Sequence, residues 1–244
     1  MADYMAELRT FGRDGMYIGN AETTLRAAGQ ACGWKLLTDI DRNGLAAYLE
    51  RRKTDGAAPR TLASIAATLR QFCRWAVRGQ RLDRNPVADV VRIDQAGDRR
   101  RKRRALTPDE VGRLLRVAGP RELLYRLALG TGLRRRELQR LQWRAVDRDG
   151  PRPCLRLRPE ATKSKRADVL PLGTRLARRL RAARPVNVAP TAPVFRSVPK
   201  FDPWKADLTK AGIDYGDEAT GEIVGFHSLR VTFISELERS GVSP

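Results

Sequence analysis

Two motifs, far apart in the sequence, place an arginine three positions from a second ionisable residue. Arg134 and Glu137 form the first motif, and His227 and Arg230 form the second. Residues three positions apart share one face of a helix, so both members of a pair can act on one group. A guanidinium can hold two oxygens of a phosphate at once, and an imidazole can exchange a proton near neutral pH. This chemistry suits a site that holds a nucleic-acid phosphodiester while the phosphodiester reacts.

Local sequence places Arg134 at the start of a helix. It follows Thr-Gly-Leu, and the pattern predicts a helix from about Leu133 through Trp143. The free backbone N–H groups of a helix start favour an anion beside Arg134. Arg135 and Arg136 diverge around the same helix, so we expect them to face solvent or DNA. Taken alone, the first motif also fits a surface ion pair, and the second fits a structural histidine.

The charge of the chain points to a polyanionic partner. Lysine and arginine number 48 against 28 aspartate and glutamate, which gives a net charge of +20. Arginine supplies most of the excess, and its planar fork suits bidentate binding of phosphate. The composition therefore favours a nucleic-acid partner, with a protein that coats RNA as the alternative.

Cysteine usage and hydropathy exclude several classes of protein. Cys32, Cys73 and Cys154 are widely separated and form no C-x-x-C pair, which argues against a disulfide framework and a zinc site. We expect free thiols in a reducing cytoplasm. The N-terminus lacks the features of a secretion signal, and no segment reaches the length of a membrane span. The sequence thus predicts a cytoplasmic protein without a membrane partner.

Residues 1–93 are predicted to form a helical, DNA-gripping domain. Apolar residues recur at steps of three and four, and the expected helices cover Glu22–Cys32, Arg42–Lys53 and Thr61–Arg78. Arg70, Arg74 and Arg78 form a stripe along the last of these helices. Such a stripe is often a solvated face, but the net charge favours contact with a nucleic-acid backbone.

Residues 94–104 are predicted to be a basic linker, because they contain six consecutive basic residues and no large apolar one. We expect Arg100, Arg101 and Lys102 to lie along a DNA backbone. This basic run could instead be a tract like a nuclear-localisation signal, or charge that simply keeps the protein in solution.

Residues 105–244 are predicted to form a second domain that contains a small antiparallel sheet. Thr107, Pro108 and Glu110 have the spacing of a capped helix start, and Cys154–Leu172 alternates as a β-hairpin with a basic turn. Further helices are expected over Glu122–Leu129, ending at Gly130, after a capping Thr174, around Trp204–Ala211, and over Leu229–Arg239 with Ser228 as its cap. The fold class is therefore mainly α, with an α+β second domain.

The order and spacing of these motifs resemble the tyrosine recombinases, the phage-integrase family of site-specific DNA recombinases. The run from Thr131 to Asp147 looks like the first arginine box of the family, and His227 to Arg230 matches the second. Lys163 lies eight residues before Pro171, as the family's hairpin lysine typically does. The segment from Thr61 to Pro86 is similar to the last part of the family's core-binding domain.

The resemblance implies a role for each residue. Arg134 and Arg230 would hold the non-bridging oxygens of the scissile phosphate, and Glu137 would support that arrangement. Lys163 would protonate the leaving 5′ oxygen, and His227 would act as acid, base or hydrogen-bond donor. No metal or other cofactor is implied, because a covalent 3′-phosphotyrosine conserves the energy of the broken bond.

The same resemblance implies duplex DNA as the partner, with Lys165 among its contacts. Family members act as tetramers that exchange C-terminal segments. In the family the tyrosine nucleophile follows the second arginine box, whereas every tyrosine of this chain precedes it. We therefore expect a truncated homologue that binds DNA without cleaving it and forms a weakened homo-oligomer. An intact enzyme given as an incomplete sequence and a non-catalytic decoy or regulator are the alternatives.

The chain also departs from the family at two positions in the arginine boxes. Val231 stands where a histidine often follows the second arginine, and Arg136 replaces a common glycine. We expect both changes to be tolerated.

Overall fold

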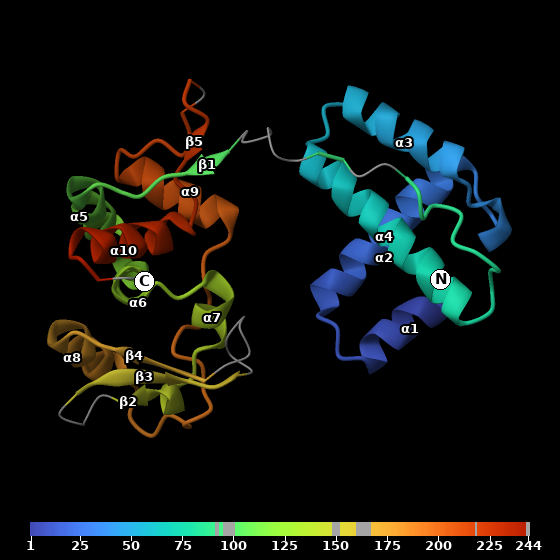
Figure 1. Cartoon of the computed structure of the whole chain (residues 1–244). Helices are drawn as coiled ribbons and strands as arrows, with labels where there is room; N and C mark the ends of the chain where they lie inside the picture. The colour runs from blue at the N-terminus through green and yellow to red at the C-terminus, as the bar shows by residue number, and fades with distance from the viewer. Residues whose placement is uncertain (91–92, 95–100, 148–151, 160–166, 218, 243–244) are drawn as a thin grey trace. The chain divides into compact units, whose positions relative to one another are not determined.

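The computed structural model describes residues 1–90, 93–94, 101–147, 152–159, 167–217 and 219–242. The chain divides into two compact units, Met1–Arg99 and Arg100–Pro244 (Figure 1). Each unit buries a hydrophobic cluster of its own. Most of the described residues are helical and the sheets are small, so the predicted fold class is confirmed. No helix in the described part of the chain is both long and apolar enough to cross a bilayer.

The first unit is a set of packed helices. These are α1 (Ala2–Thr10), α2 (Gly15–Cys32), α3 (Arg42–Thr54) and α4 (Pro59–Arg78), with a short 3-10 turn at Leu37–Asp39. The helix α2 begins at Gly15 rather than at Glu22, because the Asp14 carboxylate accepts the Met16 N–H and so caps an earlier start. The predicted apolar stripe of α4 is buried, which leaves Arg74 and Arg78 exposed.

An aromatic cluster fixes α1 to α4 within this unit. The ring of Tyr4 lies 5.3 Å from that of Phe72 and 5.2 Å from that of Trp75. The Trp75 indole donates a 2.7 Å hydrogen bond to the Glu7 carboxylate. Paired aromatic rings add to the stability gained by their burial, so this contact holds α1 against the longest helix of the unit.

The second unit contains helices, a three-stranded sheet and a two-stranded sheet. Its strands are β1 (Lys102–Arg103), β2 (Val146–Asp147), β3 (Cys154–Leu157), β4 (Asp168–Pro171) and β5 (Glu222–Ile223). Its helices are α5 (Pro108–Val117), α6 (Glu122–Thr131), α7 (Arg135–Arg140), α8 (Thr174–Ala183), α9 (Phe201–Lys210) and α10 (Ser228–Arg239), with 3-10 turns at Gly119–Arg121 and Trp143–Ala145. The predicted hairpin is confirmed, with β2, β3 and β4 antiparallel and Leu155 opposite Leu170.

The end of the basic run belongs to the second unit rather than to a linker. Strand β1 pairs in parallel with β5, and the Lys102 N–H donates to the Gly221 carbonyl at 3.0 Å. The Arg104 guanidinium binds both carboxylate oxygens of Glu110 at 2.7 Å. Residues 102–104 of the predicted linker 94–104 are therefore held by a sheet and an ion pair, because Glu110 and β5 supply the partners that a linker lacks.

Helix boundaries follow from local caps. The Thr107 hydroxyl accepts the Glu110 N–H and the Glu110 carboxylate accepts the Thr107 N–H, so the predicted capped start of α5 is confirmed. Gly130 lies inside α6, and Gly132 ends the helix because it takes the left-handed conformation, with φ of +62°. The helix α8 has Gly173 at its N-cap, so Thr174 is its first residue and not its cap.

A buried ion network joins α6 to α9. Asp207 is fully buried, and its carboxylate accepts hydrogen bonds from Arg121 at 2.6 and 2.5 Å and from the Tyr125 hydroxyl at 2.5 Å. Burial would raise the pKa of Asp207, but these hydrogen bonds outweigh it and hold the pKa below its ordinary value. The carboxylate is therefore ionised inside the core of the second unit.

Candidate functional site

The site lies where the start of α10 meets the turn between α6 and α7. Arg230, in the first turn of α10, donates a hydrogen bond from Nη1 to the Gly132 carbonyl. Burial and the nearby charge of Arg134 lower the pKa of Arg230, while Glu137 raises it. Arginine keeps its proton in proteins, so two guanidinium charges stand close together here. The structure thus brings Arg134, Glu137 and Arg230 into one place.

Glu137 holds Arg134 by two separate contacts. The Arg134 backbone N–H donates to Glu137 Oε2 at 2.7 Å, and Arg134 Nη1 donates to Glu137 Oε1 at 3.1 Å. The Glu137 side chain is 7% exposed and that of Arg134 is 40% exposed. The guanidinium is therefore oriented by a buried carboxylate and remains open to a ligand. The Arg134 N–H itself does not contribute to the expected anion site on the backbone, because it donates to Glu137.

Gly132 is required at the turn for two reasons. Its φ of +62° lies in the left-handed region, which disfavours side chains. A Cβ at this position would also lie 2.3 Å from Cδ1 of Phe233, on α10. The bare backbone of Gly132 therefore lets α10 approach closely enough for Arg230 to reach the carbonyl.

Replacing Gly132 with alanine should lower the free energy of unfolding of the second unit by about 2–3 kcal/mol, combining left-handed strain with overpacking against Phe233. Urea-dependent hydrogen exchange of peptides from α6 and α10 would measure the change. Gly112→Ala is the matched control, because Gly112 lies in α5 with open space around its Cβ position. The control should stabilise α5 slightly, by up to about 1 kcal/mol. Equal effects of the two changes would contradict the role assigned to Gly132.

His227 is the N-cap of α10, a position that was expected for Ser228. The His227 carbonyl accepts the N–H groups of Arg230 at 3.1 Å and Val231 at 3.2 Å. Ser228 is instead the first helical residue, and its buried hydroxyl donates to the Ile223 carbonyl at 3.4 Å. Ser228 therefore does not cap α10, because its hydroxyl is bonded to β5.

The surroundings of His227 favour its neutral form. Partial loss of hydration lowers the pKa of His227, and the positive charges of Arg103, Arg230 and Arg134 lower it further. Arg103 comes to the site through the pairing of β1 with β5. No sequence signal distinguishes Arg103 within its run of six basic residues.

A cavity of about 380 Å³ opens beside His227. Arg103, Arg135, Lys200 and Tyr215 are among its lining residues. Arg135 donates from Nε to the Pro199 carbonyl at 2.9 Å and from Nη2 to the Val198 carbonyl at 3.1 Å. This bonding differs from the expected exposure to solvent or DNA, because loop carbonyls satisfy the Arg135 guanidinium.

The structure does not describe every predicted site residue. Lys163, Lys165 and Arg100 lie outside the described residues. Arg101 is exposed, and Lys102 Nζ lies 3.5 Å from the Glu222 carboxylate. Within the described ranges, no group of three or more His, Cys, Asp or Glu side chains could hold a metal ion.

In the first unit, the predicted arginine stripe lines one groove. Arg70, Arg74 and Arg78 share a hollow of about 850 Å³ with Arg13, which sequence periodicity does not reveal. Arg70 is the least available of them, because it donates to the Ala66 carbonyl at 3.3 Å and to the Val90 carbonyl at 3.5 Å. The remaining arginines give this unit a basic concave surface.

The family of the chain follows from a comparison with known proteins. The model of the phage integrase family matches residues 104–244, which include both arginine motifs. The chain belongs to the phage integrase family. The predicted resemblance to tyrosine recombinases is thereby confirmed.

Relatives of this integrase-family chain agree in sequence and in fold. It is 29% identical over 231 residues to the integrase of Salmonella phage P22, an alignment that covers 86% of the chain and 54% of that protein. The chain thus spans about half the length of this relative. A lambda integrase dimer bound to a COC′ core site superimposes with a TM-score of 0.73 at 20% identity, covering 99% of this chain and 89% of that one. For the Tn1549 transposon integrase in complex with transposon right end DNA, the TM-score is 0.65 at 17% identity, with coverage of 99% and 87%.

Proposed function

We propose that the chain binds duplex DNA and that its second unit holds a scissile phosphate for site-specific recombination. The observation that carries this proposal is the nearby pair of guanidiniums of Arg134 and Arg230. Glu137 orients the guanidinium of Arg134, and the Gly132 carbonyl accepts a hydrogen bond from that of Arg230. Two close positive charges are unfavourable until an anion binds between them. A phosphodiester with two non-bridging oxygens matches this arrangement.

Each group has a defined task in the reaction. Arg134 and Arg230 neutralise the charge that develops on the phosphate oxygens as a tyrosine oxygen attacks phosphorus. The bond to the 5′ oxygen breaks as the bond to tyrosine forms, and Lys163 gives the leaving oxygen its proton. His227, whose neutral form is favoured in the free protein, accepts the proton of the attacking tyrosine and, once protonated, donates a hydrogen bond to the phosphate. The products are a 3′-phosphotyrosine and a free 5′ hydroxyl, and reversal of these steps joins a new strand.

We propose that the nucleophile is none of the tyrosines in these 244 residues. Tyr125 is fully buried, and its hydroxyl is bonded to Asp207. Burial and Asp207 also raise the pKa of Tyr125, which disfavours a phenolate. Tyr215 packs edge-on against Phe201, with ring centroids 5.0 Å apart. The remaining tyrosines belong to the first unit.

A suicide DNA substrate tests this assignment. The 244-residue polypeptide should shift duplex DNA in a gel and give no covalent adduct that survives denaturation. A covalent adduct mapped by mass spectrometry to one of the five tyrosines would contradict the assignment. A failure to bind duplex DNA would contradict the proposed function itself.

The solved relatives support an assembly on DNA. The lambda integrase is described as a dimer on a core site and as a tetramer on a Holliday junction. We propose that this chain also forms a homo-oligomer on DNA. Sedimentation with and without duplex DNA would measure this tendency.

DNA affinity should rise as the pH falls towards 6, because a bound phosphate favours the protonated form of His227. In the free protein the pKa of His227 lies below its ordinary value of 6.5, so the folded state binds this proton less readily than the unfolded chain. Lowering the pH through 6.5 should therefore weaken folding while strengthening DNA binding, the latter by at most about tenfold per pH unit. Because His227 is the chain's one histidine, its imidazole NMR signals report both titrations directly. A pH-independent affinity, equal to that of His227→Gln, would contradict the prediction.

A further inference from the structure

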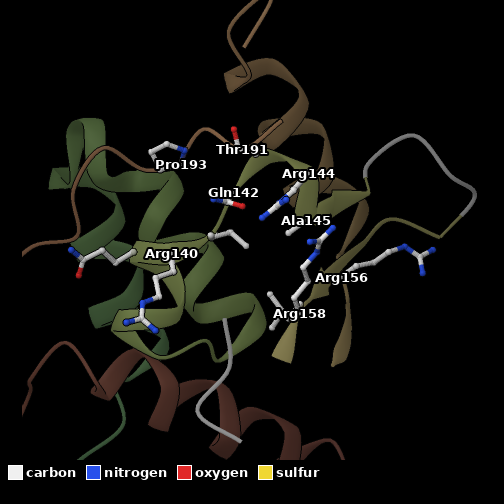
Figure 2. A pocket seen from close by; sticks show the side chains of 11 residues that line it. Arg140, Gln142, Arg144, Ala145, Arg156, Arg158, Thr191 and Pro193 are labelled. Atoms are coloured by element: carbon white, nitrogen blue, oxygen red, sulfur yellow. The ribbon is translucent and has the colours of Figure 1, made fainter. Parts of the chain in front are cut away.

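A second basic cleft opens in the second unit, at the C-terminal end of α7 (Figure 2). Its volume is about 350 Å³. Four arginines line it: Arg140 from α7, Arg144 from the 3-10 turn, Arg156 from β3, and Arg158 just beyond β3. None of the described lining residues is acidic. The cleft is therefore a concentrated positive site on the same short helix that begins beside Arg134.

The wall that carries Arg144 is rigid. Trp143 is buried, and its backbone N–H donates to the Ala192 carbonyl at 3.1 Å. The Arg144 N–H donates to the Pro190 carbonyl at 2.8 Å. Because Trp143 is anchored in the core, the next side chain along the chain is directed outward, and Arg144 is exposed. The position of its backbone is thus fixed before any ligand binds.

Ion pairs within the protein balance only part of the positive charge in this cleft. Arg156 is paired with Asp147, at 3.1 Å. Arg144 and Arg158 are exposed, and in the described ranges their guanidiniums make no hydrogen bond or ion pair. Arg156 and Arg158 stand two positions apart and so project from one face of an extended chain. Like charges gathered this way repel one another, so the arrangement gains stability from an anionic ligand.

We propose that this cleft binds a backbone phosphate of the same DNA whose scissile phosphate lies at Arg134 and Arg230. The inference rests on the proposed function. The 6 residues of α7 separate the two places, which corresponds to about 9 Å along a helix. Phosphates of one DNA strand advance by about 3.4 Å per nucleotide along the duplex axis. Both places therefore lie within the span of one duplex, so phosphates of the same DNA can occupy them.

The chemistry of the cleft favours phosphate over a protein carboxylate. Guanidinium forks bind phosphate oxygens in pairs. Gln139, Gln142 and Thr191 add neutral donors along the rim, and such side chains contact the phosphates and sugars of DNA. An acidic protein segment is the competing occupant, and the experiment below separates the two.

Paired substitutions test the inference. Arg144→Ala with Arg158→Ala should lower duplex affinity about tenfold near 0.15 M salt and reduce the slope of log K against log salt by about 1–2. Arg116→Ala with Lys205→Ala removes the same charge from exposed positions of α5 and α9 and is the matched control. The control should leave the slope nearly unchanged. Fluorescence anisotropy measures both, and circular dichroism checks that each variant is folded. Equal slopes for the two double variants would overturn the inference.

Chemical protection separates the inference from the proposed function. Phenylglyoxal modifies accessible arginines, and mass spectrometry locates the modified sites. Duplex DNA should protect Arg144 and Arg158 together with Arg134 and Arg230, over the same range of DNA concentration, and polyglutamate should not. Protection of Arg134 and Arg230 alone would overturn only the inference. Protection of neither pair would overturn the proposed function as well, and stronger protection of the cleft by polyglutamate would favour an acidic protein partner.

Discussion

Replacing Asp207 with alanine should lower the free energy of unfolding of the second unit by about 3–5 kcal/mol, a loss typical of breaking a buried ion pair. The carboxylate is fully buried and accepts hydrogen bonds from Arg121 and Tyr125. Its removal leaves a partly buried guanidinium and a buried hydroxyl without their partner. Because Asp207 joins α9 to α6, the loss should be felt in both helices.

The measurement must resolve the second unit, since a chain of two units need not unfold in one step. Urea-dependent hydrogen exchange of peptides from α6 and α9 does so. Tyr125→Phe should cost only about 1 kcal/mol, because one neutral donor is lost. Asp109→Ala, which breaks an ion pair between an exposed carboxylate and Arg113 within the second unit, should change stability by less than about 1 kcal/mol. An Asp207→Ala loss as small as that of Asp109→Ala would show that the network does not hold the helices together.

The pH dependence of this network has a definite sign. The folded-state pKa of Asp207 is below its ordinary value of 3.8. The contribution of the carboxylate to stability is therefore present above pH 3.8 and is lost as the pH falls through the lowered folded-state pKa. The exchange protection of α9 should survive at pH 4 and decline below it.

Replacing both Arg134 and Arg230 with alanine should weaken duplex binding about thirtyfold near 0.15 M salt and reduce the salt slope by about 2, as expected when two phosphate contacts are lost. The loss should be similar for different DNA sequences, because phosphate contacts carry no base information. The same change should raise the pKa of His227, since two of the charges that lower it are removed.

Lysine substitutions separate charge from geometry at this pair. Arg134→Lys with Arg230→Lys keeps both charges and loses the guanidinium forks. The salt slope should stay near that of the unchanged protein, while the affinity falls because a lysine cannot make paired hydrogen bonds to phosphate. The pair Arg116→Ala and Lys205→Ala again serves as the control for net charge. An alanine double variant with the salt slope of the unchanged protein would argue that Arg134 and Arg230 do not touch phosphate.

Local sequence patterns predict much of this fold. The apolar period of Thr61–Arg78 predicts a buried face, and the structure buries it. The spacing of Thr107 and Glu110 predicts a capped helix start, and both hydrogen bonds are present. Alternation from Cys154 predicts the hairpin. These signals succeed because each depends on neighbours within a few residues.

Contacts between distant segments escape such patterns. The Gly132 carbonyl and Arg230 are 98 positions apart, and no periodicity links them. Arg103 reaches His227 only because β1 pairs with β5, a two-residue pairing too short to leave a signal. Serine is a residue type that commonly caps helices, yet the Ser228 hydroxyl donates to the Ile223 carbonyl instead. Tertiary contacts determine the partners and orientations of such residues. The family resemblance indicates which residues belong together, and the structure shows how they are oriented.

The parallel pairing of β1 with β5 also keeps Arg103 in place whatever the number of residues before Arg101. Hydrogen bonds from Lys102 to Gly221 and from Arg104 to Ile223 fix the register on both sides of Arg103. Insertions or deletions before Arg101 therefore change the length of the segment that joins the two units without moving Arg103 away from His227. Evolution and protein engineers can accordingly vary the segment that joins the two units while the surroundings of His227 are inherited unchanged.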